Sequence, residues 1–144
     1  MSDCFTAAQR SRVMRAVKSA NTTPELVVRT LVHRLGYRFR LHAAELPGKP
    51  DLVLPRHRKA IFVHGCFWHR HRCDAGRSTP GTRQKYWRVK FARNVERDRL
   101  ALRRLRRAGW SVLVVWECHT KTAKRDQLTA RLRRFLETAA AQRK

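Results

Sequence analysis

Residues 62–73 constrain this chain more than any other segment. They hold three histidines, two cysteines and two adjacent aromatic residues, and they begin within an apolar run typical of a β-strand. In a reducing compartment, cysteines interleaved with histidines indicate a metal site rather than disulfide bonds. The polar residues from 64 to about 81 predict an irregular loop, which something other than a hydrophobic core must fix in place.

The remaining residues predict alternating helices and strands. We expect a short basic helix at 6–18, and a second helix from Thr23, as the capping hydroxyl, through Pro24 and Glu25 to Gly36. Strands are predicted at 37–41, 51–54 and 60–63, the last two as a hairpin, then a helix at 83–107, a strand at 110–116 and a final helix around 128–135. The strand at 110–116 is the most apolar, so we expect it to be central. This order predicts one α/β domain over 1–144, with a basic arm at 1–20, a core at 22–138 and helices on both faces of a mixed sheet.

The charge of the chain points to a polyanionic partner. Lysine and arginine number 34 against 10 acidic residues, a formal net charge of +24. A compact domain with such an excess repels itself unless a polyanion shares its surface, so nucleic acid is the expected partner; the alternative is an arginine-rich solvated surface. No window reaches the ~18 apolar residues of a membrane span, and the N-terminus lacks a signal-peptide core, so we expect an intracellular protein.

Four residues could close a tetrahedral, structural Zn²⁺ site: Cys66, Cys73, Cys118 and either His69 or His71. Spacing alone does not choose between the two histidines. In the alternative interpretation the cysteines are small packing residues. Cys4 stands apart near the N-terminus and is expected to be unligated.

A second candidate site involves Asp51 and His64. Asp51 begins a strand after a Gly-Lys-Pro turn, and the next strand ends at His64, so a hairpin would set the two side by side. A carboxylate is the ligand that Mg²⁺ prefers, and a neighbouring imidazole can move a proton, as metal-assisted phosphodiester hydrolysis requires. The alternatives are a turn-capping aspartate and a histidine with a local partner.

Four motifs together resemble a known family. They are the runs at 46–51 and 61–73, the pair Asn94 and Asp98, and the ending at 109–118. In this order and at this spacing they resemble the very short patch repair (Vsr) endonucleases, which nick DNA beside the thymine of a T:G mismatch left when 5-methylcytosine deaminates. The resemblance covers about 6–135 and implies a variant of the PD-(D/E)XK nuclease fold.

The resemblance implies a role for each matching residue. Asp51 is the expected Mg²⁺ ligand, together with the backbone carbonyl of Val63, at a position where the family often has threonine. If the threonine hydroxyl also helps, this chain should bind its second metal less well. His64 and His69 are expected to organise water and proton transfer, with His69 as general base, and Glu25 is expected to support the metal-bound water. The implied zinc ligands are Cys66, His71, Cys73 and Cys118, and the implied aromatic wedge entering the DNA stack is Phe67, Trp68 and Trp87; the alternative for these aromatics is packing.

The sequence therefore predicts a DNA endonuclease that nicks on the 5′ side of the thymine in T:G mismatches, with one or two catalytic Mg²⁺ ions and one structural Zn²⁺ ion. Double-stranded DNA is the expected partner, and the resemblance adds mismatch-recognition proteins, a repair polymerase and a companion cytosine methyltransferase. We expect a monomer in the bacterial cytoplasm, associated with the nucleoid. The alternatives are a nicking or restriction-type endonuclease with another target, and a zinc-stabilised DNA-binding module without catalysis.

Overall fold

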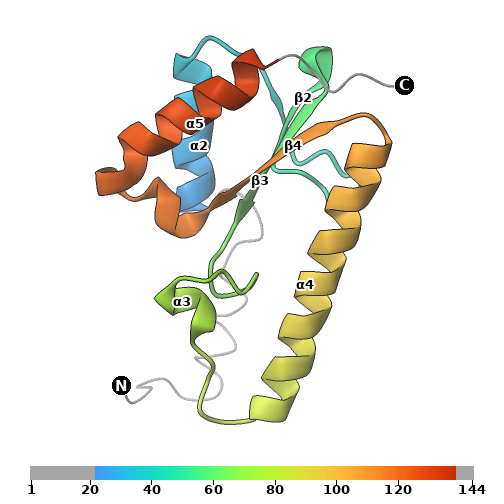
Figure 1. Ribbon diagram of the computed structural model, residues 1–144, viewed down its shortest axis with the longest axis vertical. Coiled ribbons are helices and arrows are strands. Elements are labelled where there is room, and N and C mark those ends of the chain that lie inside the picture. The colour runs from blue at the N-terminus through green and yellow to red at the C-terminus, as the bar shows by residue number, and fades with distance from the viewer. Residues whose placement is uncertain (1–21, 139–144) are drawn as a thin grey trace.

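The computed structural model describes residues 22–138 (Figure 1). The predicted helix at 6–18, the basic arm and Cys4 lie outside these residues. Within the described part of the chain, no helix is both long enough and apolar enough to cross a lipid bilayer.

The centre of the described chain is a mixed sheet with the strand order β1-β2-β3-β4. Its strands are β1 (Arg40–Leu41), β2 (Leu52–Leu54), β3 (Lys59–His64) and β4 (Ser111–Trp116). The first three are antiparallel neighbours, which confirms the predicted hairpin, and β3 and β4 run parallel with Ile61 opposite Leu113. The predicted central position of β4 is wrong, because β4 is an edge strand and β3 lies inside the sheet. β4 is apolar because helices cover both of its faces. Its apolar composition therefore does not indicate whether it is a central or an edge strand of the sheet.

Three helices cover the sheet (Figure 1): α2 (Thr23–Arg34) and α5 (Arg125–Glu137) pack side by side on one face, and α4 (Gln84–Arg107) crosses the other. Alternate residues of β3 divide between the two cores, with Ile61 facing α2 and α5 and Phe62 facing Ala101 and Leu105 of α4. Helices on both faces of a mixed sheet are confirmed. Because β3 and β4 are parallel, the chain must return across the sheet between them, and α4 makes this crossover.

Some predicted boundaries differ from the structure. Thr22, not Thr23, caps α2, with its hydroxyl accepting a hydrogen bond from the Glu25 amide at 3.3 Å. The strand predicted at 37–41 is only the two residues of β1, because Tyr37 and Phe39 pack beside the core instead of extending the ladder. The loop predicted after His64 contains the short helix α3 (Asp74–Arg77). Three 3₁₀ turns complete the described elements: η1 (Pro55–His57), η2 (Glu117–Thr120) and η3 (Thr122–Lys124).

Lys59, the first residue of β3, is almost fully buried at 2% exposure. Its ammonium group donates hydrogen bonds to the carbonyl oxygens of Phe135 at 2.7 Å, Leu136 at 2.6 Å and Thr138, so it caps the C-terminal end of α5. Burial lowers the pKa of Lys59. A buried cation in this place satisfies carbonyls that a helix end otherwise leaves unpaired and interacts favourably with the helix dipole.

Replacing Lys59 with methionine should lower the free energy of unfolding by about 2–4 kcal/mol, because the α5 carbonyls lose a charged donor while remaining buried. Urea denaturation measures this difference. The matched control is Lys85→Met, an exposed lysine in the first turn of α4. Equal stability of the two variants would show that solvent can replace the Lys59 cap.

Candidate active site and metal centre

A cavity of about 560 Å³ lies between the sheet and α4, and several of the predicted site residues line it. Four of them come from the residue before β2, from β3 and from the loop after β3: Asp51, Val63, His64 and His69. The α4 residues Arg97, Asp98, Ala101 and Leu102 close the opposite wall. The antiparallel pairing of β2 and β3 therefore brings together carboxyl and imidazole groups that are far apart in sequence.

Asp51 immediately precedes β2, and one of its carboxylate oxygens accepts a hydrogen bond from the Val63 amide at 2.7 Å. This bond fixes the carboxylate against β3. Burial raises the pKa of Asp51 to about 7; the Val63 amide opposes this rise, and the neighbouring Glu25 carboxyl adds to it. A carboxylate that is costly to leave charged without a counter-ion is a good cation ligand.

Two parallel imidazole rings face the cavity. His64, at the end of β3, stacks on His69 with ring centroids 3.9 Å apart and an interplanar angle of 3°. Burial lowers the pKa of His64 to about 4, and His69 adds to this shift, so His64 is neutral at pH 7. His69 Nδ1 lies 2.5 Å from a carboxylate oxygen of Asp98 on α4, which leaves Nε2 as the ring nitrogen free of this bond.

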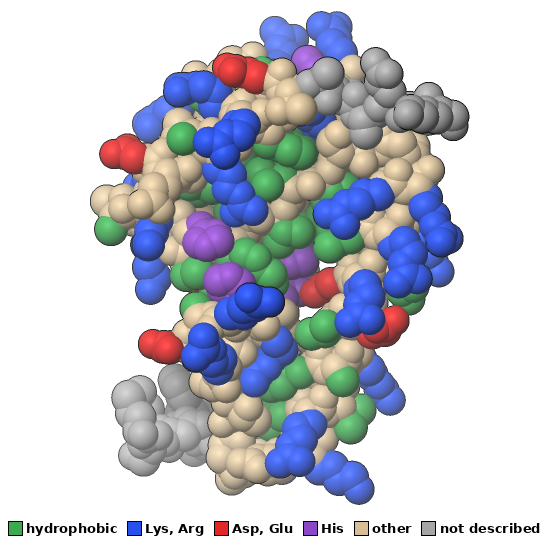
Figure 2. All heavy atoms as spheres, in the orientation of Figure 1, with side chains coloured by type: hydrophobic (Ala, Val, Ile, Leu, Met, Phe, Trp, Pro, Cys, Tyr) green, Lys and Arg blue, Asp and Glu red, His purple; other side chains and the backbone are tan. Residues whose placement is uncertain are grey.

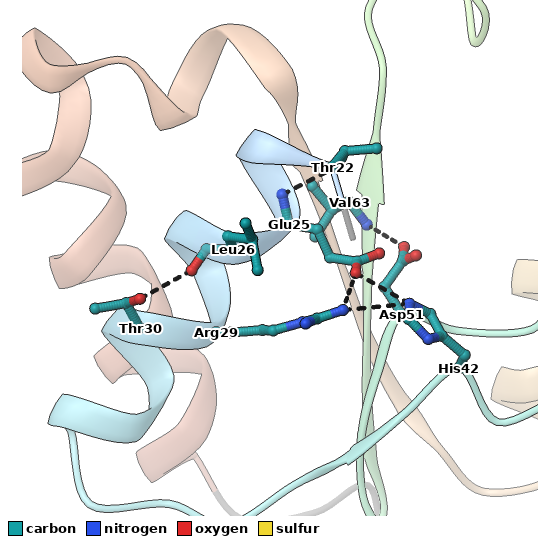
Figure 3. A network of polar contacts seen from close by, with 8 residues as sticks. All are labelled: Thr22, Glu25, Leu26, Arg29, Thr30, His42, Asp51 and Val63. Carbon is teal, nitrogen blue, oxygen red and sulfur yellow. Dashed lines mark hydrogen bonds and ion pairs between the residues drawn. The ribbon is translucent and has the colours of Figure 1, made fainter. Parts of the chain in front are cut away.

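Glu25, His42 and Arg29 form a polar network behind Asp51 (Figure 3). Glu25 is buried at the start of α2; its carboxylate pairs with Arg29 one turn along the helix and lies 3.0 Å from His42 Nε2. Figure 3 shows the side chains of Glu25, His42 and Asp51 converging from three segments of the chain. Their ligand atoms lie within 4.8 Å of one another, so these three residues could share a cation.

A separate cluster unites the four predicted zinc ligands, Cys66, His71, Cys73 and Cys118, whose ligand atoms all lie within 4.8 Å of one another. His71 Nδ1 is 3.8 Å from the Cys66 sulfur and 3.5 Å from the Cys118 sulfur. A tetrahedral zinc ion with bonds of ~2.3 Å to sulfur and ~2.0 Å to nitrogen separates its ligands by about 3.5–3.8 Å. The donor set and its spacing therefore fit such an ion.

Backbone geometry and ring stacking fix this thiol–imidazole cluster. Gly76 of α3 passes so close to the loop that an added Cβ would lie 1.9 Å from the His71 carbonyl oxygen. The His71 ring stacks on Trp116 of β4 at 4.4 Å, so the sheet supports it. Burial raises the pKa of Cys66 to about 12, and the hydrogen bond with His71 lowers that of Cys73 to about 6.

The predicted wedge residues Phe67, Trp68 and Trp87 form one half-buried cluster with Phe91. Phe67 lies 5.0 Å from Trp68 and 6.0 Å from Trp87 between ring centroids. Asn94 on α4 donates to the Trp68 backbone carbonyl at 3.1 Å, which ties the loop to the helix. The three aromatics thus adjoin the cavity wall without entering either main core.

Two basic side chains, Lys49 and Arg97, line the cavity. On the face drawn in Figure 2, lysine and arginine occupy most of the outline, including the side where Figure 1 draws α4, and histidines gather near the middle. α4 alone exposes a series of arginines, among them Arg88, Arg93, Arg97, Arg103 and Arg107. This charge distribution fits a phosphate backbone approaching the cavity.

Comparison with known proteins assigns the family. The sequence model of the family described as DNA mismatch endonuclease Vsr matches residues 2–75. The DNA mismatch endonuclease Vsr of Escherichia coli (strain K12) is 42% identical over 147 residues, covering 99% of this chain and 94% of that protein. This chain belongs to the Vsr endonuclease family. The type II nicking enzyme V.XorIIP of Xanthomonas oryzae pv. oryzae is 45% identical over 137 residues, covering 95% of this chain and 98% of that enzyme.

Vsr family membership makes the chain a DNA endonuclease and confirms the resemblance stated from the motifs. It also implies a nuclease fold for the mixed sheet and its helices. Three residues that the sequence reasoning did not assign to the site lie within it: Arg29, His42 and Asp98. Only Asp98 had a signal, because Asn94 and Asp98 are one turn apart on a helix that is otherwise mostly basic.

Proposed function

We propose that this Vsr-family endonuclease nicks double-stranded DNA on the 5′ side of the thymine in T:G mismatches, in a reaction that depends on Mg²⁺. The observation that carries the proposal is the cavity beside β3, where a half-buried carboxylate and two stacked imidazoles face an arginine-rich helix. A phosphodiester entering it meets positive charge, a cation-binding carboxylate and proton-transfer groups together.

Asp51 is the proposed ligand of one or two Mg²⁺ ions, together with the backbone carbonyl of Val63 and the phosphate oxygens. Bound there, the cation polarises the phosphorus and lowers the pKa of a coordinated water. Because only the carbonyl of Val63 is used, valine serves as well as threonine at this position. Glu25, buried beside Asp51, is placed to accept a hydrogen bond from such a water.

His69 is the proposed general base, acting through Nε2 while Asp98 engages Nδ1. This division fixes the tautomer in which Nε2 carries the lone pair that accepts the proton of the attacking water. His64, neutral and stacked on His69, is proposed to steady the water near the leaving group. The products are then a nick with 5′-phosphate and 3′-hydroxyl ends.

Asp98 is therefore a positioning residue, and Asp98→Asn should lower kcat by about 10–100-fold with little change in KM. The reason is that an amide NH₂ facing Nδ1 favours the wrong tautomer of His69. Single-turnover nicking from pH 6 to 9 measures the effect. Glu96→Gln, an exposed carboxylate on the same helix, is the control. An unchanged rate and pH profile for Asp98→Asn would remove Asp98 from the mechanism.

Two further features support the same function. Phe67, Trp68 and Trp87 are proposed to wedge into the base stack at the mismatch, where unstacking costs least. A structural Zn²⁺ in the thiol–imidazole cluster is proposed to hold the loop that carries Phe67 and Trp68 at the cavity.

The fold is proposed to be a PD-(D/E)XK variant that forms a single domain. The protein is proposed to act as a monomer, because an asymmetric mismatch has no two-fold axis. Mismatch-recognition proteins and a repair polymerase remain proposed partners, and the nucleoid its proposed location.

A second candidate differs only in its target. Relatives named type II nicking enzymes support the nicking reaction itself, and a nicking endonuclease with another target is therefore the second candidate. End-labelled duplexes differing at one pair, T:G, T:A or C:G, distinguish the two when incubated with the protein and Mg²⁺. We expect nicking of the T:G duplex alone, at least 100-fold faster than that of T:A by the discrimination typical of mismatched sites. Equal nicking of T:A and T:G would exclude mismatch specificity, and no nicking of any duplex would exclude the proposed reaction.

A further inference from the structure

His42 follows β1 directly and has a backbone conformation that few residues other than glycine adopt. Its φ angle is +49°, in the left-handed region. Its amide donates to the Asp51 carbonyl at 3.1 Å, so the ladder between β1 and β2 continues through this residue. Non-glycine residues persist in this conformation when their surroundings require it, and such residues cluster at functional sites.

The left-handed turn aims the His42 ring at the carboxylates beside the cavity (Figure 3). Nε2 lies 3.0 Å from Glu25, and the ligand atoms of His42, Glu25 and Asp51 fall within 4.8 Å of one another. The side chain is 22% exposed, and its Nε2 atom contacts the charged groups of Glu25 and Arg29.

An electrostatic role for His42 would duplicate an existing contact. The guanidinium of Arg29 already pairs with the same carboxylate oxygen of Glu25, and it lies 3.5 Å from His42 Nε2. What the imidazole adds to two carboxylates is a nitrogen donor. Carboxylate and water oxygens suit both Mg²⁺ and Mn²⁺, whereas an imidazole nitrogen favours first-row transition metals, to which Mn²⁺ belongs and Mg²⁺ does not.

We propose that His42 is a further ligand of the divalent cation at Asp51, and that its nitrogen shifts the preference of this site from Mg²⁺ towards Mn²⁺. The inference rests on the cation site of the proposed function and concerns which ion that site selects. It gives a role to a side chain that the proposed hydrolysis does not use.

The test compares Mn²⁺ and Mg²⁺ binding by the zinc-loaded full chain, free and bound to a nicked T:G duplex. Isothermal titration calorimetry measures both cations, and electron spin-echo spectroscopy detects nitrogen bound to Mn²⁺. His42→Asn is the variant, since asparagine tolerates the left-handed conformation but is too short to reach the cation. His33→Asn, an exposed histidine on α2, is the control.

We expect His42→Asn to weaken Mn²⁺ binding at least about tenfold, to weaken Mg²⁺ binding less than about threefold, and to abolish the nitrogen modulation, with His33→Asn unchanged. If His42→Asn keeps the Mn²⁺ affinity and the nitrogen modulation of the wild type, while Asp51→Asn binds neither cation, the role of His42 is overturned and the cation site at Asp51 stands. Absence of any binding that depends on Asp51, with and without DNA, would overturn the cation site of the proposed function as well.

Discussion

Asp51→Asn is expected to lower the nicking rate by at least about 1000-fold while leaving DNA affinity within about threefold. Asparagine keeps the size of the side chain and an oxygen that can accept a hydrogen bond from the Val63 amide. It lacks the negative charge that would hold a cation. We expect binding to DNA to depend on the arginines of α4 and not on this carboxylate. The variant thus separates catalysis from binding.

Single-turnover nicking of the labelled T:G duplex and fluorescence anisotropy measure the two quantities. Asp126→Asn, an exposed carboxylate in the first turn of α5, is the matched control. Nicking by Asp51→Asn at more than a tenth of the wild-type rate would remove Asp51 from the cation site. Full activity of Asp51→Asn would show that the Asp51 carboxylate has no catalytic role in the cavity.

The same substitution is expected to stabilise the protein when Mg²⁺ is absent. Because the folded-state pKa of Asp51 is about 7, above its ordinary 3.8, the folded chain keeps a proton that the unfolded chain releases. The contribution of Asp51 to stability is therefore complete below pH ~4 and is lost as pH rises through 7, a loss of up to about 4 kcal/mol. Asparagine has no proton to lose.

Urea denaturation at pH 5 and pH 8, in buffer without Mg²⁺ and without a chelator that would remove zinc, measures this effect. The free energy of unfolding should fall more between these pH values for the wild type than for Asp51→Asn. Added Mg²⁺ should narrow the gap at pH 8, because a cation relieves the buried charge. A gap that does not depend on pH would contradict the raised pKa.

Cys118→Ser is expected to have the largest effect on stability, lowering the melting temperature by more than ~10 °C and reducing nicking with it. The residue lies in η2, after the edge strand, and its sulfur meets His71 from the loop after β3. Without it a bound ion would keep three protein ligands, and the loop would lose its metal-mediated link to the end of the sheet. Phe67, Trp68 and His69 lie on that loop.

Elemental analysis should find about one zinc per wild-type chain and much less in Cys118→Ser. Cys4→Ser, a cysteine that the sequence sets apart from the cluster, is the control. A zinc-free wild type of undiminished stability would refute the structural metal. A stable Cys118→Ser variant that binds zinc but does not nick would instead place the cluster in the reaction.

Element types were predictable along most of the described chain because their signals are local. Apolar residues four apart marked α4 and α5, and short apolar runs marked β2, β3 and β4. Strand order is not a local property, and it was predicted wrongly for β4. The length of β1 also depended on tertiary packing, since Tyr37 and Phe39 joined the core beside the sheet.

The candidate site divides in the same way. Asp51 and His64 were expected to lie together because the sequence predicted a hairpin. The cysteines were expected to lie together because few other residue types bind zinc. His42 gave no such pattern, and the spacing of Asn94 and Asp98 marked Asp98 without showing which partner it meets, since each residue reaches the site from another element through the folded backbone. A positive φ at His42 and the rotation of α4 that aims Asp98 at His69 cannot be read from composition.

By itself, the sequence of 62–73 and its matching motifs determined the family, the residue types of the site and the need for positive charge against DNA. Residue chemistry and spacing left the division of that segment open, the family resemblance implied it, and the tertiary structure gives its physical basis. It places Cys66 and His71 in the thiol–imidazole cluster, His64 and His69 in the cavity, and Phe67 against α4. The reason is geometric: successive residues of one loop point in different directions, and only the surrounding sheet and helix determine which partner each side chain meets.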